Sequence, residues 1–166
     1  MRYEDCGSDV VKLMGEIQDK YFQDLRSAKI KCIFDTKLRK SKGRVMLATI
    51  RKTNELLRHL TIEEAKTEEG FDYIVTINKK AWELTSDVDK ERLLRHELRH
   101  SFISHEDVKD PYRIIDHDIQ DFVEEVKLNV DDPGWANRVS ALVLDAYEQE
   151  REAAKEAKKA KKKRKL

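Results

Sequence analysis

Apolar residues follow a helical spacing near the start of the chain and form short clusters after it. Residues 9–28 carry apolar side chains three and four positions apart, which predicts an amphipathic helix. Two short strands are predicted over residues 31–37 and 44–50, with Ser41-Lys42-Gly43 as the turn between them. Residues 53–60 fit either a helix or irregular structure. The first part of the chain therefore combines helical and strand patterns.

The second half of the chain predicts one more strand and several helices. Residues 71–77 form a strand pattern that follows Glu69-Gly70 and leads into a short helix. Asp132-Pro133-Gly134 breaks the chain before the last helix. The longer helices are expected over residues 87–104, 117–130 and 135–160. Because the chain shows no internal repeat and no interdomain linker, these elements predict one α+β domain with a small sheet and a helix beneath it.

The helix predicted over 87–104 contains His96-Glu97-Leu98-Arg99-His100, the HExxH pattern of zinc peptidases. Two histidines four residues apart lie on one face of a helix and can bind a single metal ion. Glu97 lies about a hundred degrees round the helix, where it can reach a metal-bound water more easily than the ion itself. The spacing therefore predicts His96 and His100 as zinc ligands and Glu97 as a general base.

The residues around the motif favour a helix that lines a cleft. Leu94, Leu98 and Phe102 recur every fourth residue and predict a buried stripe beside the two histidines. Ser86 or Asp87 can cap the start of this helix. The alternative interpretation is a charged helix face on which both histidines are ordinary surface residues.

A third ligand is expected, because catalytic zinc usually has three protein ligands and keeps one position for water. Three kinds of candidate lie downstream: His105, His117 and the carboxylates of residues 116–126. A ligand at His105 would require an abrupt chain reversal after the motif helix. His117 begins the next helical pattern, and a residue there can face the first helix across a cleft. We therefore expect His117 to be the third ligand.

Acidic residues surround His117 on both sides. Asp116 or Asp118 could orient a histidine by accepting the hydrogen of its other ring nitrogen. Asp121 and Glu124 are the next candidates for the third ligand. The alternative is that the Asp-His-Asp cluster is only the polar N-terminus of a helix.

The order of these segments resembles the putative phage metallopeptidases, small zincin-like domains distantly similar to SprT-like proteases. The resemblance covers about residues 8–135 and is carried by residues 71–82, the motif helix and residues 117–122, which match a His-Asp-hydrophobic-x-x-Phe stretch. It implies a zincin-like domain with a short mixed sheet, an HExxH helix, a C-terminal helix and His117 as a ligand. Two features depart from the family: the long charged side chain of Arg99 within the motif and a C-terminal extension.

The resemblance also implies how a substrate would bind. In zincin folds a strand at the sheet edge pairs with an extended peptide, and the strand at 71–77 is expected to take this role. Zinc would polarise the scissile carbonyl, while Glu97 would deprotonate the attacking water and later protonate the leaving amine. Tyr112, Arg113 and His105 are within reach by sequence to stabilise the oxyanion, but each fits a surface loop equally well.

Charge is distributed unevenly along the chain. The 34 basic and 33 acidic residues give a net charge of +1, but residues 151–166 hold nine of the basic residues and two glutamates. We expect residues 1–150 to form the zincin-like metallopeptidase domain and residues 151–166 to form a basic, partly disordered tail. The tail could tether the protein to nucleic acid through nonspecific charge, or it could be a solubilising extension. It contains no aromatic residue, so base stacking is not indicated.

The cysteine content and the hydrophobic runs indicate a cytoplasmic protein, in the host cell if the gene is carried by a phage. Cys6 and Cys32 are isolated, and neither is part of a CxxC pair. We expect Cys32 to be a core residue and Cys6 a free surface thiol. Residues 1–6 contain no hydrophobic segment of a signal peptide, and no apolar run approaches the eighteen residues of a membrane span.

The sequence thus predicts a zinc endopeptidase that hydrolyses protein or peptide substrates, with DNA-associated proteins as the suggested targets. One alternative is a zinc-stabilised binding or decoy protein with little turnover. Another is a nucleic-acid-binding module led by the tail, in which the HExxH motif is a structural relic. The intact Glu97 favours the enzyme, because a purely structural site has no need of a base.

Overall fold

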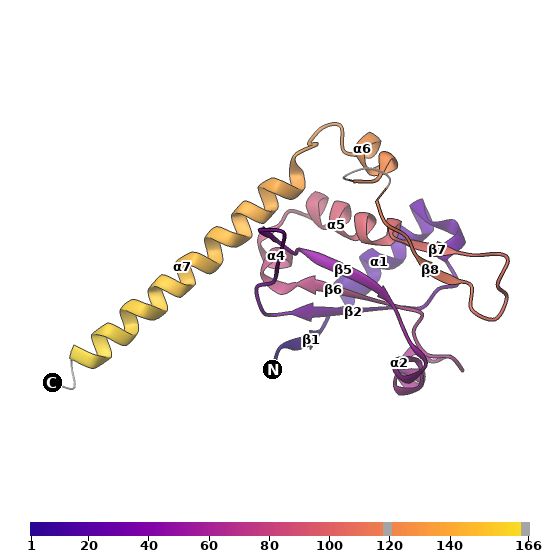
Figure 1. Cartoon of the computed structure of the whole chain (residues 1–166), viewed down its shortest axis with the longest axis horizontal. Coiled ribbons are helices and arrows are strands. Elements are labelled where there is room, and N and C mark those ends of the chain that lie inside the picture. Colours follow the sequence, from indigo (N-terminus) through magenta and orange to yellow (C-terminus); the bar gives the residue numbers. More distant parts are fainter. Residues whose placement is uncertain (118–120, 164–166) are drawn as a thin grey trace.

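The computed structural model describes residues 1–117 and 121–163, and it contains a mixed β-sheet packed against helices (Figure 1). The strands are β1 (Tyr3–Asp5), β2 (Ile30–Asp35), β3 (Lys40–Ser41), β4 (Arg44–Val45), β5 (Ala48–Lys52), β6 (Tyr73–Asn78), β7 (Ser101–Ile103) and β8 (Tyr112–Ile114). The helices are α1 (Ser8–Tyr21), the 3-10 turn η1 (Gln23–Leu25), α2 (Glu55–Leu60), α3 (Ile62–Ala65), α4 (Lys79–Leu84), α5 (Asp87–Arg99), α6 (Val123–Leu128) and α7 (Trp135–Lys163). This content confirms the α+β class.

The main sheet has four strands in the order β1-β2-β6-β5, in which β2 and β6 are parallel and the other pairs are antiparallel. Strand β6 lies inside the sheet, and the side chains of Tyr73, Val75 and Ile77 on its helix-facing side are 0% exposed. The expectation that the strand at 71–77 forms the edge is therefore wrong. The edge next to β6 is β5. A run of apolar residues indicates that a strand is buried, but it does not indicate which strands will pair with it.

The hydrophobic core lies between the sheet and the helices α1, α5 and α7. Alternate residues of β2 and β6 point into it, because successive side chains of a strand face opposite sides of the sheet. The core cluster includes the buried residues Val10, Met14, Ile17, Cys32, Val75, Ile77, Leu93, Leu94, Leu98, Trp135, Val139 and Val143. Burial of these side chains fixes α5 beneath the sheet.

Helix α5 begins as predicted but ends earlier. The side chain of Ser86 caps it by accepting a hydrogen bond from the backbone N–H of Asp89. The helix was expected to continue to residue 104 with Phe102 buried, yet it ends at Arg99, and Phe102 lies on β7 with half of its surface exposed. The reason is a long-range pairing: β7 forms an antiparallel hairpin with β8. Leu94 and Leu98 are buried as predicted.

The loop between the first two predicted strands does not join neighbours in the sheet. Lys42 and Gly43 have positive φ angles of 49° and 78° and form the tight turn of the small hairpin β3–β4. The strand predicted at 44–50 divides into β4 and β5, and β5 pairs with β6 rather than with β2. The helix predicted over 117–130 is shorter and forms α6, while residues 118–120 lie outside the described residues.

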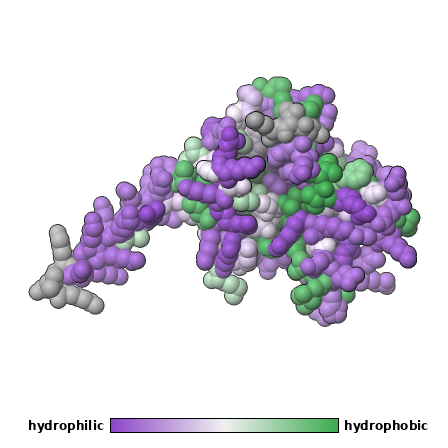
Figure 2. Space-filling view, in the orientation of Figure 1, coloured by the Kyte–Doolittle hydropathy of each residue, from purple (hydrophilic) through white to green (hydrophobic). Residues whose placement is uncertain are grey.

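Helix α7 packs on the body through its first half and projects away from it afterwards (Figure 1). Trp135, Val139 and Val143 are buried, whereas every residue from Arg151 to Lys162 is exposed. The helix runs without interruption across position 150, where the tail was expected to begin. Figure 2 shows the hydrophilic surface of this projecting part.

Two further expectations can be compared with the described residues. Cys32 is buried in the core as predicted, but Cys6 is half-buried against that core rather than lying on the surface. Among the helices of residues 1–117 and 121–163, none combines the length and the apolar composition of a membrane-spanning segment.

Candidate metal centre

Helix α5 and the segment after β8 bring three histidines together. Each of His96, His100 and His117 offers one ring nitrogen, and these nitrogens all lie within 4.8 Å of one another. The Nε2 atoms of His96 and His117 are 3.0 Å apart. A tetrahedral zinc ion with Zn–N bonds of about 2.0–2.1 Å would hold its nitrogen ligands roughly 3.3 Å apart. The cluster therefore has the dimensions and the donor set of a site for one metal ion.

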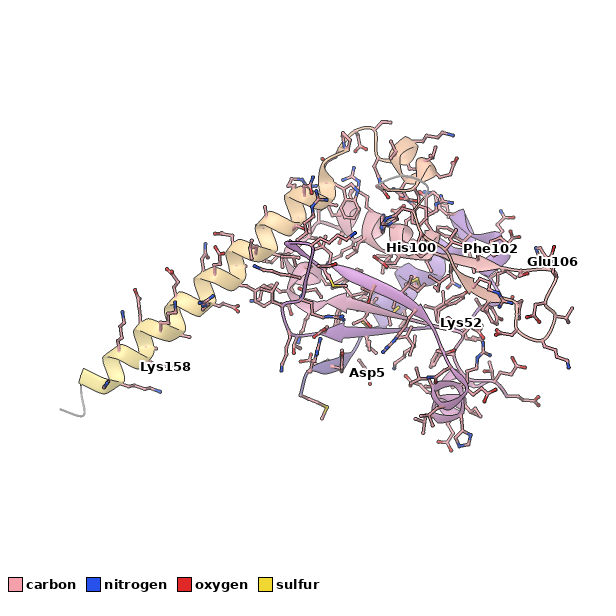
Figure 3. All side chains as sticks on the ribbon, in the orientation of Figure 1. Asp5, Lys52, His100, Phe102, Glu106 and Lys158 are labelled. Atoms are coloured by element: carbon pink, nitrogen blue, oxygen red, sulfur yellow. The ribbon has the colours of Figure 1, made fainter. Side chains whose placement is uncertain are left out.

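The second ring nitrogen of each motif histidine is held by the protein. Nδ1 of His96 lies 2.9 Å from Oδ1 of Asp121, and Nδ1 of His100 lies 2.7 Å from the backbone oxygen of Ile115. Because both oxygens accept hydrogen bonds, Nδ1 carries the hydrogen in each ring and Nε2 keeps its lone pair for a metal. Figure 3 labels His100 near the hairpin β7–β8 that carries Phe102.

These contacts correct the expected roles of the acidic residues. Asp121 was expected as a candidate ligand, but it hydrogen-bonds to His96 and is not part of the three-histidine cluster. Asp116 is exposed, and its charge raises the pKa of His100, while a backbone carbonyl holds the His100 ring. Glu124 is exposed and pairs with Lys127 at 3.2 Å. The second orienting candidate, Asp118, lies outside the described residues.

The electrostatic environment differs between the two motif histidines. Burial lowers the pKa of His96, but the hydrogen bond to Asp121 and the charge of Glu97 outweigh burial and raise this pKa above its usual value. Burial lowers the pKa of His100, which favours the neutral ring that a metal requires. Burial raises the pKa of Asp121, but the hydrogen bonds from His96 and from the backbone N–H of Phe122, together with the charges of His96 and His117, outweigh burial and lower this pKa, so the carboxylate stays ionised.

Glu97 lies on α5 and is almost fully buried, with 6% of its surface exposed. Burial raises the pKa of its carboxyl group from 4.5 to about 7, and the charge of His96 and the backbone N–H of Ile50 on β5 partly oppose this rise. A carboxylate with a pKa near neutrality is well matched to accept a proton and to return it. The raised pKa of Glu97 is therefore suited to proton transfer near neutral pH.

Phe122 forms the apolar wall of the cluster. Its ring centre lies 5.5 Å from that of His96, 4.7 Å from that of His100 and 4.9 Å from that of His117, and the residue is 3% exposed. In the sequence, Phe122 was the last residue of the His-Asp-hydrophobic-x-x-Phe stretch, and no contact with the histidines was predicted for it. Its fixed position five residues after His117 was the signal that could have indicated this contact.

The remaining candidates from the sequence are engaged elsewhere. His105 is exposed in the β7–β8 loop and is not part of the cluster. Tyr112 packs edge-on against Tyr73 with ring centres 5.5 Å apart. The guanidinium of Arg113 donates to a carboxylate oxygen of Asp107 at 2.9 Å. Tyr112 and Arg113 are thus held by residues of β6 and of the β7–β8 loop, and a role in stabilising the oxyanion stays a prediction for all three.

A hollow of about 720 Å³ lies beyond the end of β5 and not at the histidines. It is lined by Lys52, Arg58, His59 and residues of neighbouring loops, and it contains none of the four predicted site residues. The three-histidine cluster is therefore not part of this hollow.

Comparison with known proteins gave one match. A family model described as putative phage metallopeptidase matches residues 1–158. Comparison with curated proteins and comparison with solved structures gave no match.

Proposed function

The chain belongs to the putative phage metallopeptidase family, and from this premise we propose that it is a zinc-dependent endopeptidase. His96, His100 and His117 would bind the zinc ion, and Glu97 would be the general base. The observation that carries the proposal is the group of three imidazoles whose ligand atoms lie within 4.8 Å of one another. Three protein ligands leave one position for water or substrate, which is the arrangement of catalytic rather than structural zinc.

The residues of the chain account for the proton transfers of peptide hydrolysis. A bound zinc ion would supply a Lewis acid that polarises the scissile carbonyl and acidifies a water molecule. Glu97 would accept the proton of the attacking water and pass it to the leaving nitrogen. Asp121 would hold His96 in the tautomer that binds metal, and Phe122 would keep bulk water away from the imidazoles.

The edge strand β5 is the surface on which an extended peptide would bind. Asn78 donates to the carbonyl of Leu47 at 2.8 Å, and Thr53 donates to that of Asp72 at 3.0 Å. Because hydrogen-bonded pairs alternate along an antiparallel ladder, the backbone groups of Ala48, Ile50 and Lys52 point away from β6. Among these groups, the N–H of Ile50 already pairs with the carboxyl group of Glu97. Main-chain pairing at this edge would place a substrate next to Glu97 with little side-chain preference.

The test combines metal analysis with a cleavage assay. Purified protein should take up about one zinc per chain, and His100→Ala should lose it. The zinc-loaded protein should cleave an unfolded protein substrate, while Glu97→Gln should bind zinc and cleave far more slowly. Failure of the wild-type protein to bind zinc at neutral pH would overturn the metal site. Zinc binding with no cleavage above the Glu97→Gln level would favour a non-catalytic binding protein.

A second function is supported by the projecting part of α7, which would bind nucleic acid. Its exposed side chains include a row of cations spaced by four, three and four residues, so they share one helix face. The row consists of Arg151, Lys155, Lys158 and Lys162. Alanines occupy the opposite face and offer too little apolar surface to enter a membrane. Cations in a row can contact successive phosphates, which would bring the peptidase to DNA-associated proteins.

The nucleic-acid proposal predicts a strong salt dependence. Four phosphate contacts would give a log–log slope of affinity against salt concentration of about −3 to −4. Replacing the four residues of the row by Gln should remove this binding, whereas Lys159→Gln with Lys161→Gln, outside the row, should weaken it far less. Cleavage of a free peptide should be unchanged in both variants. Equal DNA binding by a protein without residues 151–166 would refute the proposal.

A further inference from the structure

A row of arginines runs along α5 beside the motif histidines. Arg92, Arg95 and Arg99 are three and four residues apart, so they share one face of the helix. Arg95 directly precedes His96, and Arg99 directly precedes His100. The arginine face is therefore one residue, or about a hundred degrees, away from the histidine face.

Two of these arginines bind one buried carboxylate of α6. Nε of Arg95 donates to Oε2 of Glu125 at 2.8 Å, and Nε of Arg99 donates to Oε1 at 2.9 Å. Glu125 is 0% exposed, and Arg95 also donates to the side-chain oxygen of Asn129 one turn further along. Because removal of one partner would leave a buried charge unpaired, α6 has one strongly preferred position on α5.

The arginines are themselves fixed from the other side by the end of α1. The guanidinium of Arg95 lies 5.2 Å from the ring centre of Tyr21, and that of Arg99 lies 4.6 Å from the ring centre of Phe22. Aromatic rings attract a guanidinium over their faces and restrict its orientation. This packing gives Arg99 a role that the sequence did not suggest, since a charged residue at this place in the motif was unexpected.

The bound carboxylate lies close to the metal cluster along the chain. Glu125 is four residues after Asp121, which holds His96, and three residues after Phe122, which contacts all three imidazoles. Phe122 is the N-cap of α6, so α6 begins immediately after the two contacts. A shift of α6 on α5 would therefore move Asp121 and Phe122 with it.

We propose that Glu125, held by Arg95 and Arg99, is a positioning residue that sets the metal affinity and the coordination geometry of the three histidines. The inference rests on the metal site of the proposed function and concerns how that site is held in place. A purely structural ion pair would stabilise the fold without changing how the folded protein binds a metal. The two roles can therefore be separated by measuring stability and metal affinity on the same variants.

The chain provides a matched control on the same helix face. Arg92 is also buried, and it donates to Asp89 at 3.0 Å and to Asp131 at 2.6 Å. Its partners precede the motif or follow α6, and none of them contacts an imidazole. Arg92→Gln therefore breaks comparable ion pairs without releasing the residues that hold the cluster.

The experiment compares the wild-type protein with Arg99→Gln, Glu125→Gln and Arg92→Gln. Zinc dissociation constants are measured by competition with a chromogenic chelator, at a temperature where circular dichroism shows each metal-free protein to be folded. The visible absorption of the cobalt-loaded proteins reports coordination geometry, and thermal unfolding of the metal-free proteins reports stability. Arg99→Gln removes one donor and leaves the Arg95–Glu125 pair, so it provides a folded variant if Glu125→Gln unfolds.

Positioning by Glu125 predicts that Arg99→Gln alters the cobalt spectrum and weakens zinc binding, by about 10-fold, the lower end of the loss seen when a direct hydrogen-bond partner of a metal ligand is removed. Arg92→Gln should lower the unfolding temperature about as much as Arg99→Gln does and keep the wild-type zinc affinity. Wild-type zinc affinity and cobalt spectrum in folded Arg99→Gln would overturn the inference while leaving the proposed function intact. A wild-type protein that binds neither metal would overturn both.

Discussion

Replacing Glu97 by Gln should show how much stability the protein gives up to keep a buried base. Burial raises the pKa of this carboxyl group from 4.5 to about 7. One pKa unit corresponds to about 1.4 kcal/mol, so ionised Glu97 costs the folded metal-free protein roughly 3 kcal/mol. The amide of Gln resembles the protonated carboxyl group and carries no charge, so the variant avoids this cost.

The sign and the pH window of the effect follow from the raised pKa. The folded protein binds the proton of Glu97 more tightly than the unfolded chain does. The contribution of this carboxyl group to stability is therefore fully present below about pH 4.5 and is lost as the pH rises to about 7. Metal-free Glu97→Gln should therefore match the wild-type protein near pH 4.5. It should be more stable by up to about 3 kcal/mol at pH 8. His96 is coupled to Glu97 by charge and titrates within the same difference, whereas titrating groups remote from Glu97 are common to both proteins and cancel.

Urea unfolding in the presence of a chelator, at several pH values from 4.5 to 8, measures this difference directly. A parallel assay with zinc-loaded proteins measures turnover, which should fall about 10²- to 10⁴-fold in Glu97→Gln because the amide cannot accept a proton. A stability difference that does not change with pH would refute the claim that burial raises the pKa of Glu97. Cleavage at the wild-type rate would refute its role as the base.

Three further predictions concern other parts of the molecule. His117→Ala should weaken zinc binding far more than His105→Ala, because only His117 lies in the cluster; isothermal titration with zinc decides this, and the reverse order would be contrary to the proposed ligands. Burial raises the pKa of Cys6 and Cys32 to about 12, so at pH 8 both thiols should react with a disulfide reagent much more slowly in the folded than in the urea-unfolded protein. Tyr73→Phe should lower the free energy of unfolding in urea by about 1–3 kcal/mol, because the hydroxyl accepts a hydrogen bond from the backbone N–H of Arg113 at 3.0 Å and donates to the backbone carbonyls of Phe102 and Arg113. No loss would show that water replaces these bonds.

The sequence indicated the features that depend on neighbours a few residues away. The four-residue spacing of His96 and His100 places them on one helix face through helical geometry alone. Ser86 was one of two predicted caps, and its role is local as well. The α+β class and the family could also be predicted, because the class follows from the periodicity of apolar residues and the family from the order of the motifs along the chain. The roles of the predicted ligands and of Glu97 stay predictions until metal binding and turnover are measured.

Tertiary structure decided the features that join distant segments. It placed β6 inside the sheet and β5 at its edge, and it ended α5 at Arg99 because β7 pairs with β8. It also placed Glu125 against Arg99, 26 residues earlier in the chain. Such contacts have no local signature, since a strand pattern or a charged residue is compatible with many partners. Which partner it meets depends on how the whole chain packs around its core.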